Sequence, residues 1–98
     1  MFLGCEGREL ERDIAYPYND LKVESKSSME ECQAFCKADR RCFGWDFNTK
    51  SHAKPGVCAI KSQRTGRIKA NGSVSGHRDA CVTGTIKEKN PDLNGLYF

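Results

Sequence analysis

The chain has 98 residues, of which 38% are hydrophobic and 30% are charged. A chain of this length forms one domain with a modest core and leaves no room for a second. No stretch approaches the roughly 18 consecutive apolar residues of a transmembrane helix, so membrane insertion is not expected. Six cysteines in so short a chain are typical of an extracellular domain held together by disulfide bonds. Met1-Phe2-Leu3 is too short for a signal peptide, so either the signal has been removed or the chain is a module of a longer secreted chain. We expect the module, because the first cysteine already lies at position 5.

The net charge of +3 is distributed unevenly along the chain. Residues 1–49 carry seven basic and ten acidic side chains, whereas residues 50–98 carry nine basic and three acidic ones. No acidic residue lies between Asp46 and Asp79. An asymmetry of this kind bears on the partners of a protein rather than on its fold, and it draws attention to the basic residues of the second half.

Two short extended segments are predicted first. Residues 8–16 mix charged and apolar side chains, and we interpret them as extended because Pro17 disfavours helix in the residue before it. Residues 18–20 have turn chemistry. Residues 21–24 alternate between apolar and charged side chains, as expected for a strand.

A helix is predicted over residues 28–39. Ser28 and Glu31 have the spacing of a capping box, in which two side chains satisfy free backbone N–H groups at the start of a helix. Cys32 and Cys36 lie four positions apart and therefore share one face of this helix. Apolar neighbours at helical spacing indicate that this face is buried.

An aromatic strand follows the helix. From Cys42 onward the pattern changes to a period of two, which places Phe43, Trp45 and Phe47 on one side of a strand. Trp45 is also the kind of residue on which a sugar stacks. Its position between two phenylalanines at strand spacing favours a place in the core instead.

Residues 57–62 form the clearest strand of the second half. Cys58 must point inward to form a bridge, so Ile60 points inward as well. The alternation then directs Ala59 and Lys61 outward.

A hairpin is predicted after this strand. Residues 67–70 form a short strand in which Ile68 points inward and its charged neighbours point outward. Asn71-Gly72 is a strong signal for a hairpin turn. A last strand then runs from Val74 to about Arg78.

Two segments have features beyond secondary structure. Asn71-Gly72-Ser73 matches the acceptor sequence for N-glycosylation, and its place in a predicted turn makes it accessible. Residues 83–98 carry charges and turn residues without any periodicity, so we interpret them as a linker or tail.

The basic residues of the second half predict a binding surface. Their orientation on the strands puts most of them on the outer face of the sheet, where they would bind an anionic partner such as a sulfated or sialylated glycan, or an acidic protein surface. The alternative is a solvated surface that protects the sheet edges. Nucleic acid is not expected as the partner of a disulfide-rich secreted domain. The candidate ligand-binding residues are Lys61, Arg64, Arg67, Lys69 and Arg78.

Zinc binding and catalysis would require residue sets that the sequence supplies only in part. Cys32 and Cys36 have an acceptable spacing for zinc ligands, but no second close pair completes a site. Serine, histidine and aspartate side chains after residue 50 allow a nominal triad, but the centre of residues 72–76 is Val74, not the serine of a nucleophile elbow. No Walker loop or dinucleotide fingerprint occurs. We therefore predict no enzyme activity, no metal and no cofactor.

The segments VESKSSMEECQAFCKADRRCFGWDFN, GVCAIKS and VSGHRDAC, in this order, resemble the PAN/apple domain. The resemblance covers roughly Cys5 to Cys81. It implies an α+β fold, a five-stranded antiparallel sheet with one helix packed across it, with residues 1–82 as the domain and residues 83–98 as the linker. Sequence alone allows fifteen pairings of six cysteines. The resemblance implies the pairing Cys5–Cys81, Cys32–Cys58 and Cys36–Cys42.

The resemblance also implies a function in adhesion. We expect a secreted, extracellular module that binds a host-cell glycan or protein receptor, with neighbouring apple modules as further partners in a tandem array. Its polar, lysine-rich sequence looks most like a repeat of an apicomplexan microneme adhesin. Such a protein would be secreted through an organelle such as the microneme. The alternative is a structural spacer in such an array that has no ligand of its own.

Overall fold

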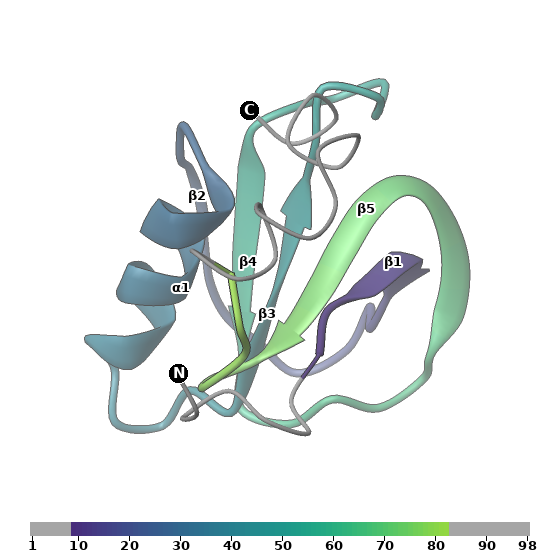
Figure 1. The fold of residues 1–98 in the computed structure, drawn as a ribbon. Helices are drawn as coiled ribbons and strands as arrows, with labels where there is room; N and C mark the ends of the chain where they lie inside the picture. The colour runs from purple at the N-terminus through teal and green to yellow at the C-terminus, as the bar shows by residue number, and fades with distance from the viewer. Residues whose placement is uncertain (1–8, 83–98) are drawn as a thin grey trace.

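Five strands and one helix make up the part of the chain that the computed structural model describes, residues 9–82. The strands form one antiparallel sheet in the order β1-β5-β3-β4-β2, and the helix packs on one face of it against β3 and β4 (Figure 1). This arrangement confirms the predicted α+β fold. The elements are β1 (Glu11–Ala15), β2 (Asp20–Ser25), α1 (Met29–Lys37), β3 (Gly44–Asn48), β4 (Val57–Lys61) and β5 (Ile68–His77).

Some sequence predictions lie outside the described residues. These are the linker over residues 83–98 and the Cys5–Cys81 bridge, since Cys5 precedes the described range. Within residues 9–82, no helix is both long enough and apolar enough to cross a membrane.

The helix begins at a capping box, as predicted, but the box is shifted by one residue. The Ser28 hydroxyl accepts a hydrogen bond from the Glu31 N–H at 3.2 Å. The Glu31 carboxylate in turn accepts from the N–H of Ser27, at 3.0 Å, rather than from that of Ser28. The first contact satisfies a donor that the helix itself leaves free, and the second holds the residue before the N-cap; together they fix where α1 starts.

Two disulfide bonds attach the helix to the sheet. Cys32 is bonded to Cys58 of β4, and Cys36 is bonded to Cys42 in the turn before β3. All four cysteines are buried. The pairing of these four is the one that the resemblance implies.

The core lies between α1 and the sheet. Trp45 is fully buried, which confirms its predicted place in the core, and its ring packs so closely on Gly76 of β5 that a Cβ there would lie 2.4 Å from it. Phe47 is buried beside it. The prediction for Phe43 is wrong: β3 begins one residue later, and the Phe43 ring is 46% exposed and lies edge-on against His77.

The predicted hairpin at Asn71-Gly72 is wrong, because β5 continues through it as one ten-residue strand. Gly72 has a φ of +87°, its N–H donates to the Asp13 carboxylate at 2.9 Å, and its carbonyl accepts from the Thr49 N–H at 2.8 Å. A residue with a positive φ bends a strand, and glycine adopts it without strain. Asn71-Gly72 therefore bends a continuous strand, which is visible as the strong curve of β5 in Figure 1.

The start of β5 also departs from expectation. Ile68 is 47% exposed, so its predicted inward orientation is wrong. It pairs with Ala15 of the edge strand β1, away from the helix and its core.

The glycosylation sequence lies in the middle of β5. Asn71 is exposed, as the glycosylation hypothesis requires, but Ser73 is buried and its hydroxyl donates to the Asn48 side chain at 3.0 Å.

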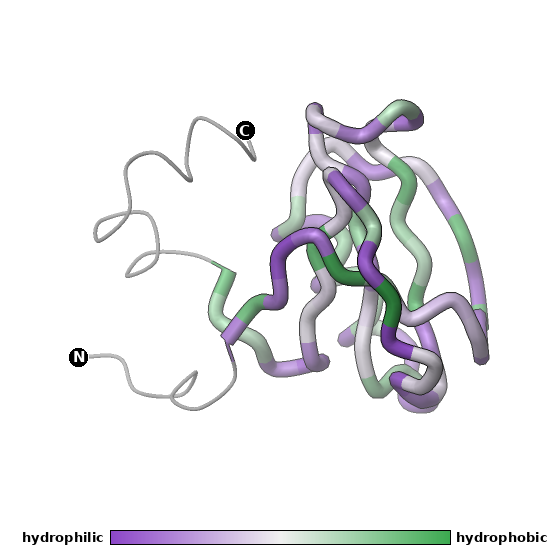
Figure 2. Tube along the Cα trace, turned by 90° about the vertical axis from the view of Figure 1, so that its right-hand side faces the viewer, coloured by the Kyte–Doolittle hydropathy of each residue, from purple (hydrophilic) through white to green (hydrophobic). Residues whose placement is uncertain are grey.

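The two faces of the sheet differ in polarity. Viewed from the side of β1 and β5, hydrophilic and hydrophobic residues alternate over short distances along the chain (Figure 2). Strands with such alternation turn one set of side chains to each face of the sheet. The apolar set meets α1, and the polar set meets the loops described below.

Candidate functional site

The sheet face opposite α1 carries buried polar side chains. Lys61, Asp46 and Ser75 project onto this face from β4, β3 and β5, and their exposed fractions are 2%, 8% and 0%. The alternation along β4 therefore gives the direction of Lys61 correctly. The prediction that Lys61 is exposed there is wrong.

The Lys61 ammonium lies between two carboxylates. It forms an ion pair with Asp20, at the start of β2, and lies 3.7 Å from the Asp46 carboxylate. Loops on both sides cover the pair: the Ser62 N–H donates to the Asn19 carbonyl at 3.0 Å, and the Asn19 amide donates to Thr65 at 2.7 Å. Lys61 is buried because these loops close over it.

A second cluster next to Lys61 is centred on Glu11 of β1. Arg64 donates to the Glu11 carboxylate at 2.8 Å and to the Ser75 hydroxyl at 2.9 Å. Arg67 donates to the other Glu11 oxygen at 2.9 Å. The Tyr16 hydroxyl donates to Glu11 at 2.5 Å, and the centre of its ring lies 4.5 Å from the Arg64 guanidinium. One carboxylate thus binds two of the predicted ligand-binding arginines.

The pKa values of the Asp46 and Glu11 carboxyl groups are shifted in opposite directions. Burial raises the pKa of Asp46, although the Tyr16 N–H at 2.8 Å and the Lys61 charge act in the opposite direction. Burial also acts to raise the pKa of Glu11, but the hydrogen bonds from Tyr16 and Arg67 and the two arginine charges outweigh it, so that pKa lies below its ordinary value. Glu11 is therefore stabilised as an anion by its neighbours.

Arg78 closes the C-terminal end of the helix. Its guanidinium donates to the backbone carbonyls of Lys37, Asp39 and Cys42, each at 2.9 Å. The Lys37 carbonyl is the last of α1 and has no donor within the helix, while Asp39 and Cys42 lie in the turn that follows. The main contacts of Arg78 are thus with the chain itself.

The five predicted ligand-binding residues consequently do not form one open surface. Lys61 is buried, Arg64 is mostly covered, and Arg78 caps the helix. Arg67 has a 58% exposed side chain but is paired with Glu11, and Lys69 is exposed on β5. The binding role proposed for these residues stays a prediction.

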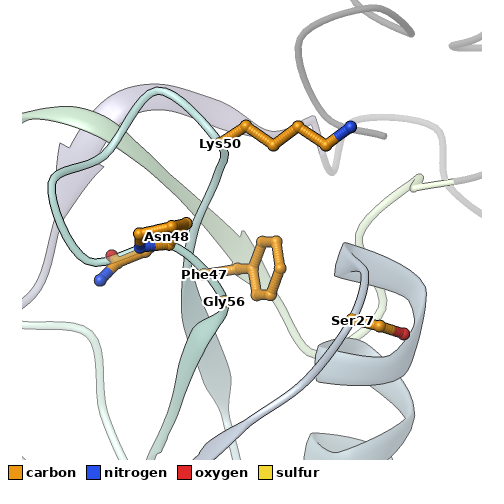
Figure 3. Close-up of a pocket in the computed structure, with 6 residues that line it drawn as sticks. Ser27, Phe47, Asn48, Lys50 and Gly56 are labelled. Carbon is orange, nitrogen blue, oxygen red and sulfur yellow. The ribbon is translucent and has the colours of Figure 1, made fainter.

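The loop between β3 and β4 contributes cations that were not among the candidates. Lys50 and Lys54 are both exposed on it. A hollow of about 200 Å³ opens between this loop and the start of α1, with the Phe47 ring pointing into it and Lys50 extended at its rim (Figure 3). The sequence signal was present, since both lysines lie in the window without acidic residues. The hollow is lined by Ser27, Phe47, Asn48, Lys50, Pro55 and Gly56.

The residues considered for zinc or catalysis have structural partners. Cys32 and Cys36 are in disulfide bonds and cannot act as ligands. Within residues 9–82, no three histidine, cysteine or acidic side chains gather as a metal site would require. The hydroxyl of Ser73 donates to Asn48, and that of Ser75 accepts from Arg64.

Comparison with known families agrees with this architecture. Residues 14–61 match the family model of the PAN domain, from the second half of β1 to the end of β4, which includes α1 and both described disulfide bonds. The sheet, the single helix and the cysteine pairs are consistent with the PAN/apple fold. PAN domains are adhesion and protein-interaction modules. No curated protein matches the sequence.

Replacing Lys61 by methionine should destabilise the domain by about 3 kcal/mol, because Asp46 would be left buried without its cation. Urea unfolding at pH 7 measures the change. Lys69→Met is the matched control: Lys69 is exposed, so its replacement should change stability by no more than about 0.5 kcal/mol. Equal effects of the two substitutions would contradict the buried ion pair.

Replacing Glu11 by glutamine should destabilise the domain at pH 7 and have much less effect at pH 3. A carboxyl group with a lowered folded-state pKa contributes stability above its unfolded pKa, about 4.3, and loses it as the pH falls through the folded value. Urea midpoints of both proteins at the two pH values provide the test. A difference that does not depend on pH would mean that Glu11 acts by packing alone.

Proposed function

We propose that the chain is an extracellular PAN-type recognition module that binds a host-cell glycan or a protein receptor. The observation that carries this proposal is the match of residues 14–61 to the PAN domain family, on a fold whose helix is bonded to its sheet by buried disulfides. Such disulfides persist in oxidising, extracellular environments. A scaffold fixed in this way presents loops and edges in a constant arrangement, as recognition requires.

An anionic ligand fits the charges that remain exposed. Of the predicted residues, Arg67 and Lys69 are still open to solvent, and the β3–β4 loop adds Lys50 and Lys54. This loop is attached to β5 at Gly72, three residues beyond Lys69. We therefore assign ligand contact to these four cations, which we call the exposed cations, and a supporting role to Lys61, Arg64 and Arg78.

A structural spacer is the second candidate. The observation in its favour is that four of the five predicted cations, all but Lys69, have partners within the described part of the domain. In this case the module would be one of several tandem copies, as in a microneme adhesin, and would contact only its neighbours. The two candidates differ in whether the isolated module has a saturable ligand.

Retention of the oxidised domain on a heparin column, at two salt concentrations, tests the first candidate. Lys50→Ala/Lys69→Ala should weaken binding about tenfold, because two charge contacts are lost. The control is Lys37→Ala/Arg40→Ala, which removes the same charge from residues at the end of α1, away from the exposed cations. Equal weakening by both variants would show that only net charge matters. Absence of wild-type binding to heparin and to a glycan array would support the spacer.

A further inference from the structure

Strand β2 is an edge of the sheet whose register shifts at its start, between Asp20 and Lys22, and is regular from Lys22 onward. Within the described residues its neighbour is β4 alone, and the pairing from Lys22 to Ser25 has no register shift. The opposite edge, β1, differs: its register shifts between Arg12 and Ile14, and Asp13 has a φ of 59°. Such a bulge prevents a further strand from pairing there, whereas β2 has no bulge over residues 22–25.

The outward-facing backbone groups of β2 belong to Val23 and its alternate neighbours. The Lys26 N–H donates to the Gly56 carbonyl at 2.8 Å. Hydrogen bonding alternates along an antiparallel ladder, so Lys22 and Glu24 direct their N–H and C=O groups toward β4. Val23 therefore directs its own outward. Its side chain is 53% exposed and lies on the face opposite α1, where it pairs with Ala59.

The two residues that flank Val23 on this edge carry opposite charges. Lys22 precedes it, Glu24 follows it, and both side chains lie on the α1 side of the sheet. If a second β2 runs antiparallel to the first with the two Val23 residues opposite each other, each Lys22 faces Glu24 of the second copy. Directly opposite residues have Cβ atoms about 4.5–5.5 Å apart, a distance at which opposite charges attract.

Both charged residues are available for such pairing. The Lys22 side chain is 51% exposed and lies 3.8 Å from Asp39, while that of Glu24 is 53% exposed and lies 3.2 Å from Lys26. The side chains of their partners Asp39 and Lys26 are 11% and 25% exposed. Asp39 keeps its ion pair with Arg41 at 2.8 Å if Lys22 turns away. Ion pairs with one solvent-exposed member contribute little to stability. Exchanging them for pairs across an interface therefore has a small cost.

We propose that two copies of this chain associate through their β2 edges, with Val23 opposite Val23 and Lys22 opposite Glu24, so that the two sheets form one continuous ten-stranded sheet. The interface is isologous, as a two-fold axis through the Val23 pair requires. It is also small, so the association is weak in solution and becomes effective where copies are held close together, as on a surface or in an array. The proposal does not depend on the ligand proposed above.

The pairing is tested by measuring the mass of the wild-type and charge-reversed proteins by sedimentation equilibrium, at concentrations up to about 1 mM. The wild-type protein should approach twice its monomer mass. Glu24→Lys and Lys22→Glu should each remain monomeric, because each puts like charges opposite each other twice. An equimolar mixture of these two variants should form a heterodimer, and the double variant Lys22→Glu/Glu24→Lys should form a homodimer again.

Controls with the same charge changes are Asp79→Lys and Arg40→Glu, two exposed residues outside β2, and both should dimerise as the wild type does. Circular dichroism establishes that every variant is folded. A wild-type protein that stays monomeric throughout the concentration range would overturn the proposal. Dimers that persist in Glu24→Lys, or a mixture of the two single variants that stays monomeric, would overturn it as well.

Discussion

The ion pairs of Lys61 hold together the elements on the sheet face opposite α1. The ammonium joins Asp20, at the start of one edge strand, to Asp46 in the middle of the sheet. The same Asp46 accepts a hydrogen bond from the backbone N–H of Tyr16, so the chain between β1 and β2 is attached to this point twice. A buried cation requires such partners, because an unpaired charge in the interior is costly. The loops over this face exclude water from Lys61 and leave it paired with these carboxylates.

The other face is fixed by covalent bonds. Cys32–Cys58 holds α1 to β4, and the apolar side chains between them include Trp45 and Met29. A bridge over this sequence separation contributes roughly 3.5 kcal/mol in the chain-entropy model, a large part of a typical total of about 5–15 kcal/mol. The domain therefore combines a small apolar core on one face with a polar one on the other. This division leaves the loops and the β2 edge of the sheet as the places where a partner can bind.

Local patterns in the sequence predicted the parts of the fold that depend on local physics. The capping residues indicated the start of α1, the period of two indicated the burial of Trp45, and the spacing of Cys32 and Cys36 indicated the buried face of the helix. Alternation also predicted the direction of Lys61, but it could not show that loops from distant parts of the chain cover the face to which Lys61 points. The hairpin prediction failed for a similar reason: the hydrogen-bond partner that holds Gly72 within a continuous strand is Asp13, 59 residues away.

The ligand-binding residues were harder to predict than the fold, because a basic side chain can either bind a ligand or pair with other groups of the same chain. Arg64 and Arg67 share the Glu11 carboxylate, and Arg78 binds carbonyls at the end of α1, all through contacts between distant residues. The proposed recognition function would therefore use the exposed side chain of Arg67 and side chains outside these clusters. The edge strand β2 and the β3–β4 loop carry such side chains.

The burial of Lys61 is tested most directly by the reactivity of individual lysines toward acetylation in the native, oxidised protein, followed by peptide mass spectrometry. Lys61 is 2% exposed, whereas Lys50, Lys54 and Lys69 are exposed. Lys61 should therefore be labelled at least about tenfold more slowly than the other three, since modification requires local opening. Labelling of Lys61 at the same rate as Lys69 would contradict the buried ion pair and return Lys61 to the set of available ligand-binding residues.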